Sequence, residues 1–215
     1  MLTDAQVERY SRQIVLPEVG GRGQERLLAA RVAIVGFGPA AVAAVTLLGR
    51  AGVGALDVSE SVGPLPELSP DCRLSRPGAG RLEGVFDAVI ELAGDAETGI
   101  HRMLVDDEQA TRPFLFGDLD GARIFVTTLV GRPCIACFGA YARETRLFPA
   151  EGAGRQMPAA PGQLALGALA ASEALRVLLS PPARGRLTAL SLEDGTGKVT
   201  DLTSTGGCTV CGGRA

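Results

Sequence analysis

Apolar runs of strand length alternate with helical patterns in the first half of the chain. Residues 31–36 form one apolar run, and residues 39–50 follow it with helical spacing and a proline in the first turn. Further runs at 56–60, 86–92 and 113–117 indicate more strands. Continuous apolar runs are typical of parallel strands that are buried on both faces. The pattern therefore predicts an α/β fold with a Rossmann-like, doubly wound, mostly parallel sheet.

The second half of the chain has a pattern that predicts antiparallel strands. Residues 122–130, 186–193 and 198–203 are strand-like, and residues 194–197 join the last two as a hairpin turn. Residues 164–179 are rich in Ala and Leu and end just before two prolines, which predicts a helix between these strands.

Two segments rich in Gly, Pro, Ala and Arg, residues 61–84 and 139–162, predict loops. Neither side of these loops has enough strands to fold alone, so we expect one domain across residues 1–215. It would have three parts: a helical arm at 1–28, a nucleotide-binding-type half at 31–120, and an antiparallel half at 122–215.

The composition excludes some classes of function. Of the 215 residues, 46% are hydrophobic, and the formal net charge of −3 offers no basic surface for nucleic acid. The pattern from Thr3 to Gln6 is a capping box, which predicts a helix at the start of the chain and not a signal peptide. We find no membrane span in the sequence, and we expect a cytoplasmic protein whose thiols stay reduced.

Four of the five cysteines form two CxxC pairs, Cys134/Cys137 and Cys208/Cys211. Four thiolates are the ligand set of a closed, tetrahedral structural zinc site, and the only histidine, His101, lies far from both pairs in sequence. A metal at these pairs would tie the C-terminal tail to the body of the domain. The alternative is a set of metal-free or disulfide-bonded thiols.

Gly36, Gly38 and Ala41 form a GxGxxA motif between a predicted strand and a predicted helix. Small residues let the backbone approach a phosphate, and a helix N-terminus offers N–H groups and a partial positive charge. Glu60, at the end of the next strand, is placed to accept hydrogen bonds from a ribose. Pro39 removes one N–H donor from this loop. A nucleotide site, a nicotinamide or flavin site and a plain tight turn are the alternatives.

These motifs together resemble the ThiF/MoeB/HesA family of ubiquitin-activating-enzyme-like adenylyltransferases. The resemblance lies in the Arg-Tyr-Ser-Arg motif that ends at Arg12, in Gly23-Gln24, in residues 32–38 and 51–54, and in the two cysteine pairs. It implies binding of ATP and magnesium, adenylation of the C-terminal glycine of a ubiquitin-like sulfur carrier, transfer of the acyl group to sulfur, and a dimer. It also implies that Arg12 reaches across the dimer interface to the ATP of the other subunit.

The middle of the chain departs from the family pattern. The Asp-x-Asp and Asn-x-x-Arg-Gln elements and the lysine of the family do not follow Glu60, and the only lysine is Lys198. The magnesium-binding acid is displaced by one residue to Asp95. Residues 139–163 contain no cysteine to accept the acyl group, and we interpret Cys72 as a buried or incidental thiol.

Losing these cationic and metal-binding groups together would remove much of the stabilisation of a nucleotidyl-transfer transition state. The sequence therefore favours a catalytically degenerate subunit that keeps Arg12 and forms a homo- or heterodimer with an adenylyltransferase-like chain, or binds a sulfur carrier. The alternative is an active ATP-dependent adenylyltransferase that acts on the C-terminus of a carrier protein or peptide, in sulfur incorporation or natural-product biosynthesis. In that case Glu60, Asp95 and loop arginines replace the usual ligands.

Overall fold

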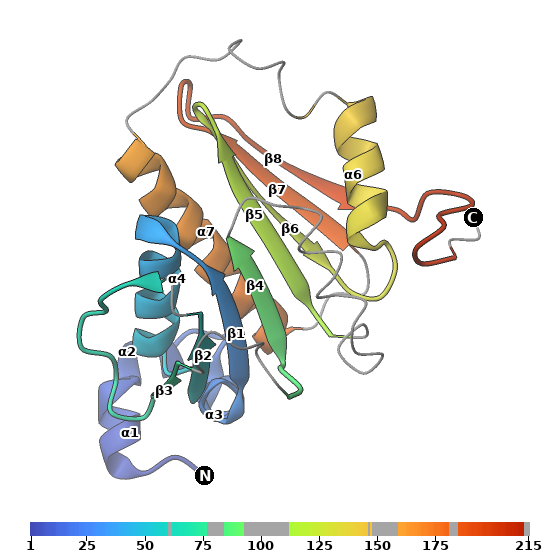
Figure 1. The fold of residues 1–215 in the computed structure, drawn as a ribbon. Helices are drawn as coiled ribbons and strands as arrows, with labels where there is room; N and C mark the ends of the chain where they lie inside the picture. Colours follow the sequence, from blue (N-terminus) through green and yellow to red (C-terminus); the bar gives the residue numbers. More distant parts are fainter. Residues whose placement is uncertain are drawn as a thin grey trace.

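The computed structural model describes residues 1–59, 62–76, 84–92, 112–145, 147, 159–180 and 185–212. Its strands form one sheet in the order β3-β2-β1-β4-β5-β6-β7-β8 (Figure 1). The strands are β1 (Arg31–Gly36), β2 (Ala55–Val58), β3 (Arg73–Ser75), β4 (Ala88–Leu92), β5 (Phe114–Asp120), β6 (Arg123–Leu129), β7 (Gly185–Ser191) and β8 (Gly197–Leu202).

Strands β1 to β5 pair in parallel, and β5 to β8 pair antiparallel. This mixed α/β sheet confirms the predicted fold class and the predicted change of direction in the second half. Two predicted loops need correction. Residues 73–75 form the short edge strand β3, which is too short and too polar to give an apolar run. Residues 139–144 belong to a helix, because the apolar side of that helix packs on the sheet.

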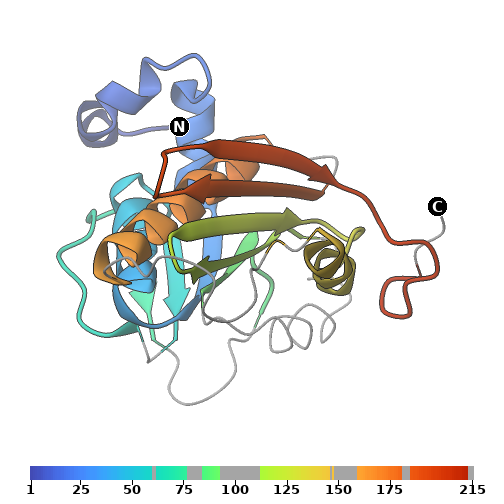
Figure 2. The ribbon, with the colours of Figure 1, turned by 90° about the horizontal axis from the view of Figure 1, so that it is seen from above.

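The described helices are α1 (Asp4–Arg9), α2 (Ser11–Ile14), α3 (Gly20–Ala29), α4 (Gly38–Arg50), α6 (Ile135–Glu144) and α7 (Ala159–Leu179). Figures 1 and 2 show α4 and α7 side by side on one face of the sheet and α6 on the other. The first face is packed with Val, Ile, Leu and Ala side chains. The second is built around Phe116, Phe125 and Phe138, whose ring centroids lie 5.7–6.2 Å apart.

Helix α7 starts five residues before the predicted boundary and lies across the core. By length and composition alone, residues 160–179 are apolar enough to cross a membrane, but half of this segment is buried inside the protein. Ala170, Ala171 and Ala174 are buried against α4 and the sheet. The apolar character of α7 is therefore accounted for by its place in the core.

Gly167 lies where α7 crosses α4. A Cβ atom on Gly167 would come within 2.2 Å of the carbonyl oxygen of Ala40, a backbone atom that cannot rotate away. We expect Gly167→Ala to lower the free energy of unfolding by about 3 kcal/mol, measured by urea denaturation, because the helices must separate. Gly139→Ala in α6 is the matched control, since its added Cβ meets only the end of Arg143 at 3.6 Å. Equal stabilities of the two variants would contradict this close crossing.

Candidate functional site

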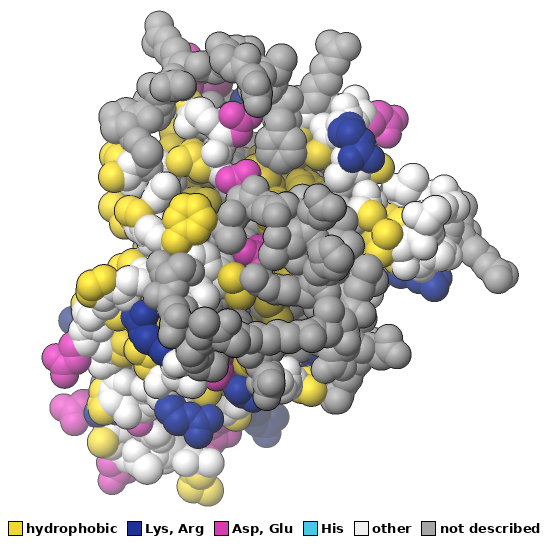
Figure 3. Space-filling model, in the orientation of Figure 1, with side chains coloured by type: hydrophobic (Ala, Val, Ile, Leu, Met, Phe, Trp, Pro, Cys, Tyr) yellow, Lys and Arg dark blue, Asp and Glu magenta, His cyan; other side chains and the backbone are white. Residues whose placement is uncertain are grey.

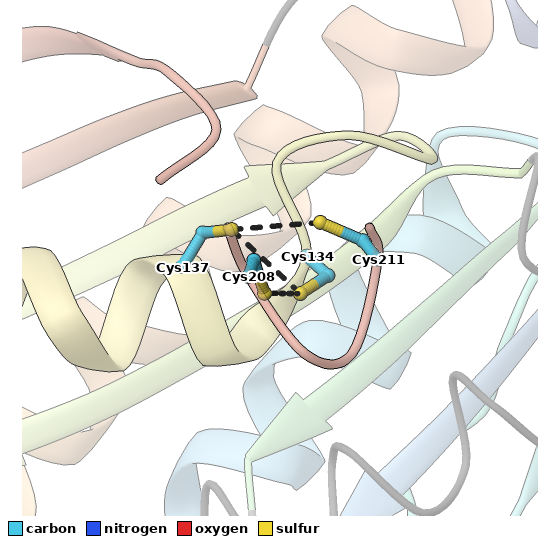
Figure 4. Close-up of side chains that lie close together, drawn as sticks. All are labelled: Cys134, Cys137, Cys208 and Cys211. Atoms are coloured by element: carbon cyan, nitrogen blue, oxygen red, sulfur yellow. Dashed lines mark hydrogen bonds between the residues drawn. The ribbon is translucent and has the colours of Figure 1, made fainter. Parts of the chain in front are cut away.

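The four paired cysteines come together at the start of α6. Cys134 is the N-cap of α6 and Cys137 lies in its first turn, while Cys208 and Cys211 lie in the tail after β8 (Figure 4). All four sulfur atoms lie within 4.8 Å of one another. The Sγ–Sγ distances are 3.7 Å for Cys134 and Cys208, 3.6 Å for Cys137 and Cys211, and 3.8 Å for Cys134 and Cys137.

These distances fit a tetrahedral metal. Zn–S bonds of about 2.3 Å place the sulfurs of a tetrahedron about 3.8 Å apart. The tail is shaped for such a site, because Gly207 and Gly212 take the left-handed backbone conformation, with φ of 74° and 60°. The N–H of Thr205 donates a hydrogen bond to Sγ of Cys137 at 3.4 Å. With four sulfur donors and no oxygen or nitrogen donor in the cluster, the residues present fit a structural zinc.

The surroundings act differently on the individual thiols. Hydrogen bonds from the backbone N–H groups of Cys211 and Val210 lower the pKa of Cys208 to about 6. Burial raises the pKa of Cys134 to about 12. Cys72 is not part of the cluster, and burial raises the pKa of its thiol to about 11.

The GxGxxA loop lies at the point where the order of the sheet reverses. The chain runs from β1 outward to β2 and β3, and then returns to β4 on the other side of β1. In open α/β sheets, ligands bind at such a switch point, outside the carboxyl ends of the strands. Gly36 ends β1 and is paired with Leu92, the last residue of β4. The loop therefore lies where a nucleotide site is expected in this fold.

Neighbouring atoms lie so close to the backbone of this loop that small residues are needed there, as the motif predicted. Gly38 has a φ of 67°, which favours glycine, and a Cβ on Gly36 would lie 3.1 Å from Leu92 and 3.3 Å from Ala41. Ser59, directly after β2, accepts a hydrogen bond from the N–H of Gly36 at 3.3 Å and donates one to the carbonyl of Gly36 at 3.1 Å. The structure thus brings Gly36, Gly38 and Ala41 together at the N-terminus of α4. Of the other predicted nucleotide ligands, Glu60 and Asp95 lie outside the described residues.

Sequence reasoning missed three side chains near this loop. Ser59 could have been found, because it directly precedes the candidate Glu60 at the end of a strand. A Cβ on Gly38 would lie 3.1 Å from Oε1 of Gln163, which comes from α7 and gave no local signal. Glu91 is fully buried near the carboxyl end of β4, in register with Val35.

Lys198 and Arg12 both lie away from the glycine loop of their own chain. Lys198 is on the edge strand β8, five positions from β1 in the sheet, where it lines a cavity of about 460 Å³ with Arg123 and Asp120. Arg12 is exposed on α2. The preceding Tyr10 packs on Gly52, just beyond the C-terminal end of α4, while the loop is at the N-terminal end of that helix.

Comparison with known proteins agrees with this geometry. The family model of ThiF matches residues 10–59, a stretch that includes Arg12 and the glycine loop. The SAMP-activating enzyme E1 of Haloferax volcanii is 28% identical over 250 residues, covering 98% of this chain and 91% of that protein. The chain is thus similar to the ThiF family over residues 10–59. A second relative, the sulfur carrier protein adenylyltransferase of Thermus thermophilus, is 28% identical over an alignment that covers 98% of this chain and 92% of that protein.

Solved structures support the fold of this chain. A crystal structure of E. coli MccB with ATP superposes with a TM-score of 0.67, at 14% identity, over 95% of this chain and 74% of MccB. Another, of PaaA, gives a TM-score of 0.65 at 19% identity over 94% of this chain and 84% of PaaA. At these identities the likeness extends to the fold alone. The predicted family resemblance is confirmed.

Proposed function

We propose that this chain is an ATP-dependent adenylyltransferase that activates the C-terminal carboxylate of a carrier protein or peptide, for sulfur incorporation or natural-product biosynthesis. The observation that carries the proposal is the glycine loop at the switch point between β1 and β4. Relatives named as a sulfur carrier adenylyltransferase and a molybdopterin-synthase adenylyltransferase, which align with 98% of this chain, support it. The sequence alone favoured a degenerate subunit, and these relatives shift the balance to an active enzyme.

In the proposed reaction, a carboxylate oxygen of the carrier attacks the α-phosphorus of ATP. A C–O–P bond forms, the bond between the α-phosphorus and the bridging oxygen breaks, and pyrophosphate leaves. The N–H groups of Gly38, Ala40 and Ala41 at the start of α4 would hold phosphate oxygens, helped by the positive end of the helix. Glu60 remains our proposed ribose ligand and Asp95 our proposed magnesium ligand. Magnesium, when bound, would neutralise charge on the phosphates.

Zinc has no chemical role in this proposal. Cys134, Cys137, Cys208 and Cys211 would fill all four of its positions, which leaves none for water or substrate. The metal would fix the tail to the start of α6.

Arg12 is proposed to act on the ATP of a second subunit. Helix α4 has 13 residues and is therefore about 20 Å long, and Arg12 lies near the end of it that is remote from the glycine loop. An arginine side chain cannot span that distance within one chain. Val7, Val15 and Leu16 on the same arm have large exposed apolar side chains, which a second copy of the chain would cover.

One observation favours a second candidate, a non-catalytic subunit that binds an adenylyltransferase-like chain or a sulfur carrier. The only lysine of the chain lies on β8, five strands from the loop strand, so no lysine is available to the phosphates within the chain. Such a subunit would still present Arg12 to its partner.

ATP–pyrophosphate exchange with a ubiquitin-like sulfur carrier ending in glycine tests the proposal. We expect micromolar binding of ATP with magnesium by calorimetry, and exchange that depends on the carrier. Binding of the carrier or of a second adenylyltransferase-like chain, without ATP binding or exchange, would instead establish the second candidate. Exchange that does not need any carrier or peptide carboxylate would contradict the proposed substrate class.

A further inference from the structure

One carboxylate, that of Asp71, anchors the first helix of the N-terminal arm. Helix α1 has no buried residue. Its side chains Gln6 and Arg9 both bind Asp71, which lies in the segment between β2 and β3. Asp71 accepts hydrogen bonds from Nε2 of Gln6 and from the hydroxyl of Tyr10, each at 3.0 Å, and forms an ion pair with Arg9. With Ser69, whose Oγ lies 2.6 Å from the Tyr10 hydroxyl, these residues form what we call the Asp71 clasp.

The partners of Asp71 in the clasp favour the charged form of its carboxylate. Burial acts to raise the pKa of Asp71, but hydrogen bonds from Gln6 and Tyr10 and the charge of Arg9 outweigh it and hold that pKa below its usual value. The carboxylate is therefore the favoured form, and it pairs with the arm from a loop more than sixty positions away in sequence. The start of α1 agrees with the sequence prediction, since Thr3 and Gln6 form the capping box.

Tyr10 connects the Asp71 clasp to α2. It is 1% exposed, its hydroxyl is held by Ser69 and Asp71, and a Cβ on Gly52 would come within 2.8 Å of its ring. Tyr10 is both the C-cap of α1 and the N-cap of α2. Fixing Tyr10 therefore fixes where α2 begins, and together with the contacts between α2 and α3 it sets the direction of α2.

The two arginines of the motif are used differently. Arg9 is paired with Asp71, whereas the exposed Arg12 side chain has no hydrogen bond or ion pair to any residue in the described ranges. Figure 3 shows charged side chains of both signs over the arm, at the lower left. The arm thus holds one arginine in place and leaves the other available to a second chain.

We propose that Asp71 is a positioning residue for the adenylation reaction: through Arg9 and Tyr10 it orients α2 so that Arg12 is presented to the nucleotide loop of a second copy of this chain. This inference rests on the proposed function. Asp71 itself would touch neither ATP nor carrier, so its effect should follow the chain that donates the arm.

Kinetics of pyrophosphate exchange provide the first test. Asp71→Asn should lower kcat about 10- to 100-fold, as expected for a misplaced transition-state group, and leave the KM for ATP within about twofold. Tyr10→Phe, which keeps the ring, should lower kcat in the same way. Glu67→Gln is the matched control, because Glu67 is an exposed carboxylate of the same segment with no ion pair to a described residue. A rise in KM with unchanged kcat would overturn the proposal.

Mixed dimers separate the two chains. Arg12→Ala removes the donated arginine, and Gly38→Asp blocks the nucleotide loop, so each variant alone should be inactive while their mixture regains activity at one site. In this mixture the Gly38→Asp chain donates the arm, so adding Asp71→Asn to that chain should remove the regained activity. Adding Asp71→Asn to the Arg12→Ala chain should leave the regained activity unchanged. The reverse pattern, or no regained activity in the first mixture, would overturn the proposal.

Limited trypsin digestion provides a readout that is independent of catalysis. Loss of the clasp should speed cleavage after Arg9 and Arg12 at least fivefold in Asp71→Asn, relative to wild type and Glu67→Gln. If wild type shows no exchange at all, the proposed function fails, and accelerated cleavage would still establish the anchoring role of Asp71. Cleavage of Asp71→Asn at the wild-type rate would overturn that role.

Discussion

Replacing Cys134 with serine is expected to lower the thermal midpoint of the protein by about 10 °C, because it removes one ligand of the proposed zinc and loosens the tail from α6. Structural zinc sites contribute about 10–16 kcal/mol of apparent binding free energy in small zinc-finger peptides. This domain has a core of its own, so we expect only part of that, about 4 kcal/mol, to be lost. Cys134 is buried, so its serine hydroxyl would also be desolvated.

Calorimetric melting, with zinc content measured by mass spectrometry, checks this prediction. Wild type should carry one zinc per chain, and a chelator should reduce its melting temperature to that of Cys134→Ser. Cys72→Ser is the control, because Cys72 lies outside the cluster and should alter neither zinc content nor stability by much. A wild-type protein without zinc that is destabilised by a reducing agent would point to disulfides instead.

Gly38→Asp is expected to reduce ATP affinity more than 100-fold and to abolish pyrophosphate exchange. The substitution adds a negative charge at the N-terminus of α4, next to where the phosphates would lie. Repulsion from several phosphate charges costs about 3 kcal/mol or more at this range. Asp tolerates the left-handed backbone better than most residues, but the φ of 67° at Gly38 and the approach of its new Cβ to 3.1 Å from Oε1 of Gln163 still cost some folding stability.

Gly195→Asp provides the control for charge and backbone. Gly195 lies in the turn between β7 and β8 with a φ of 72°, and a Cβ atom added to it would meet no atom of another element within 4 Å. The Gly195→Asp variant should bind ATP with the affinity of the wild type. Calorimetric titration with ATP and magnesium measures both variants, and equal affinities would show that the β1–α4 loop does not hold the phosphates.

The local elements could be predicted because their signals are local. The apolar run of β1, the helical spacing of α4 and the turn between β7 and β8 are each encoded by residues that are neighbours in sequence. The CxxC spacing likewise predicted that Cys134 and Cys137 act as a pair, and both lie at the start of α6. The prediction failed for segments with weak periodicity. Strand β3 is only three residues long, and the start of α6 depends on its packing against Phe116 and Phe125.

The sequence by itself determined the fold class, the family resemblance and the kinds of ligand the chain could hold, since each rests on short motifs and on the period of apolar residues. Only the tertiary structure decided which distant groups meet. The sheet order places the loop at a switch point, Asp71 reaches the arm, and Arg12 lies at the far end of α4 from the glycine loop. These relations depend on how strands and helices pack across the whole domain, and no local pattern records that packing.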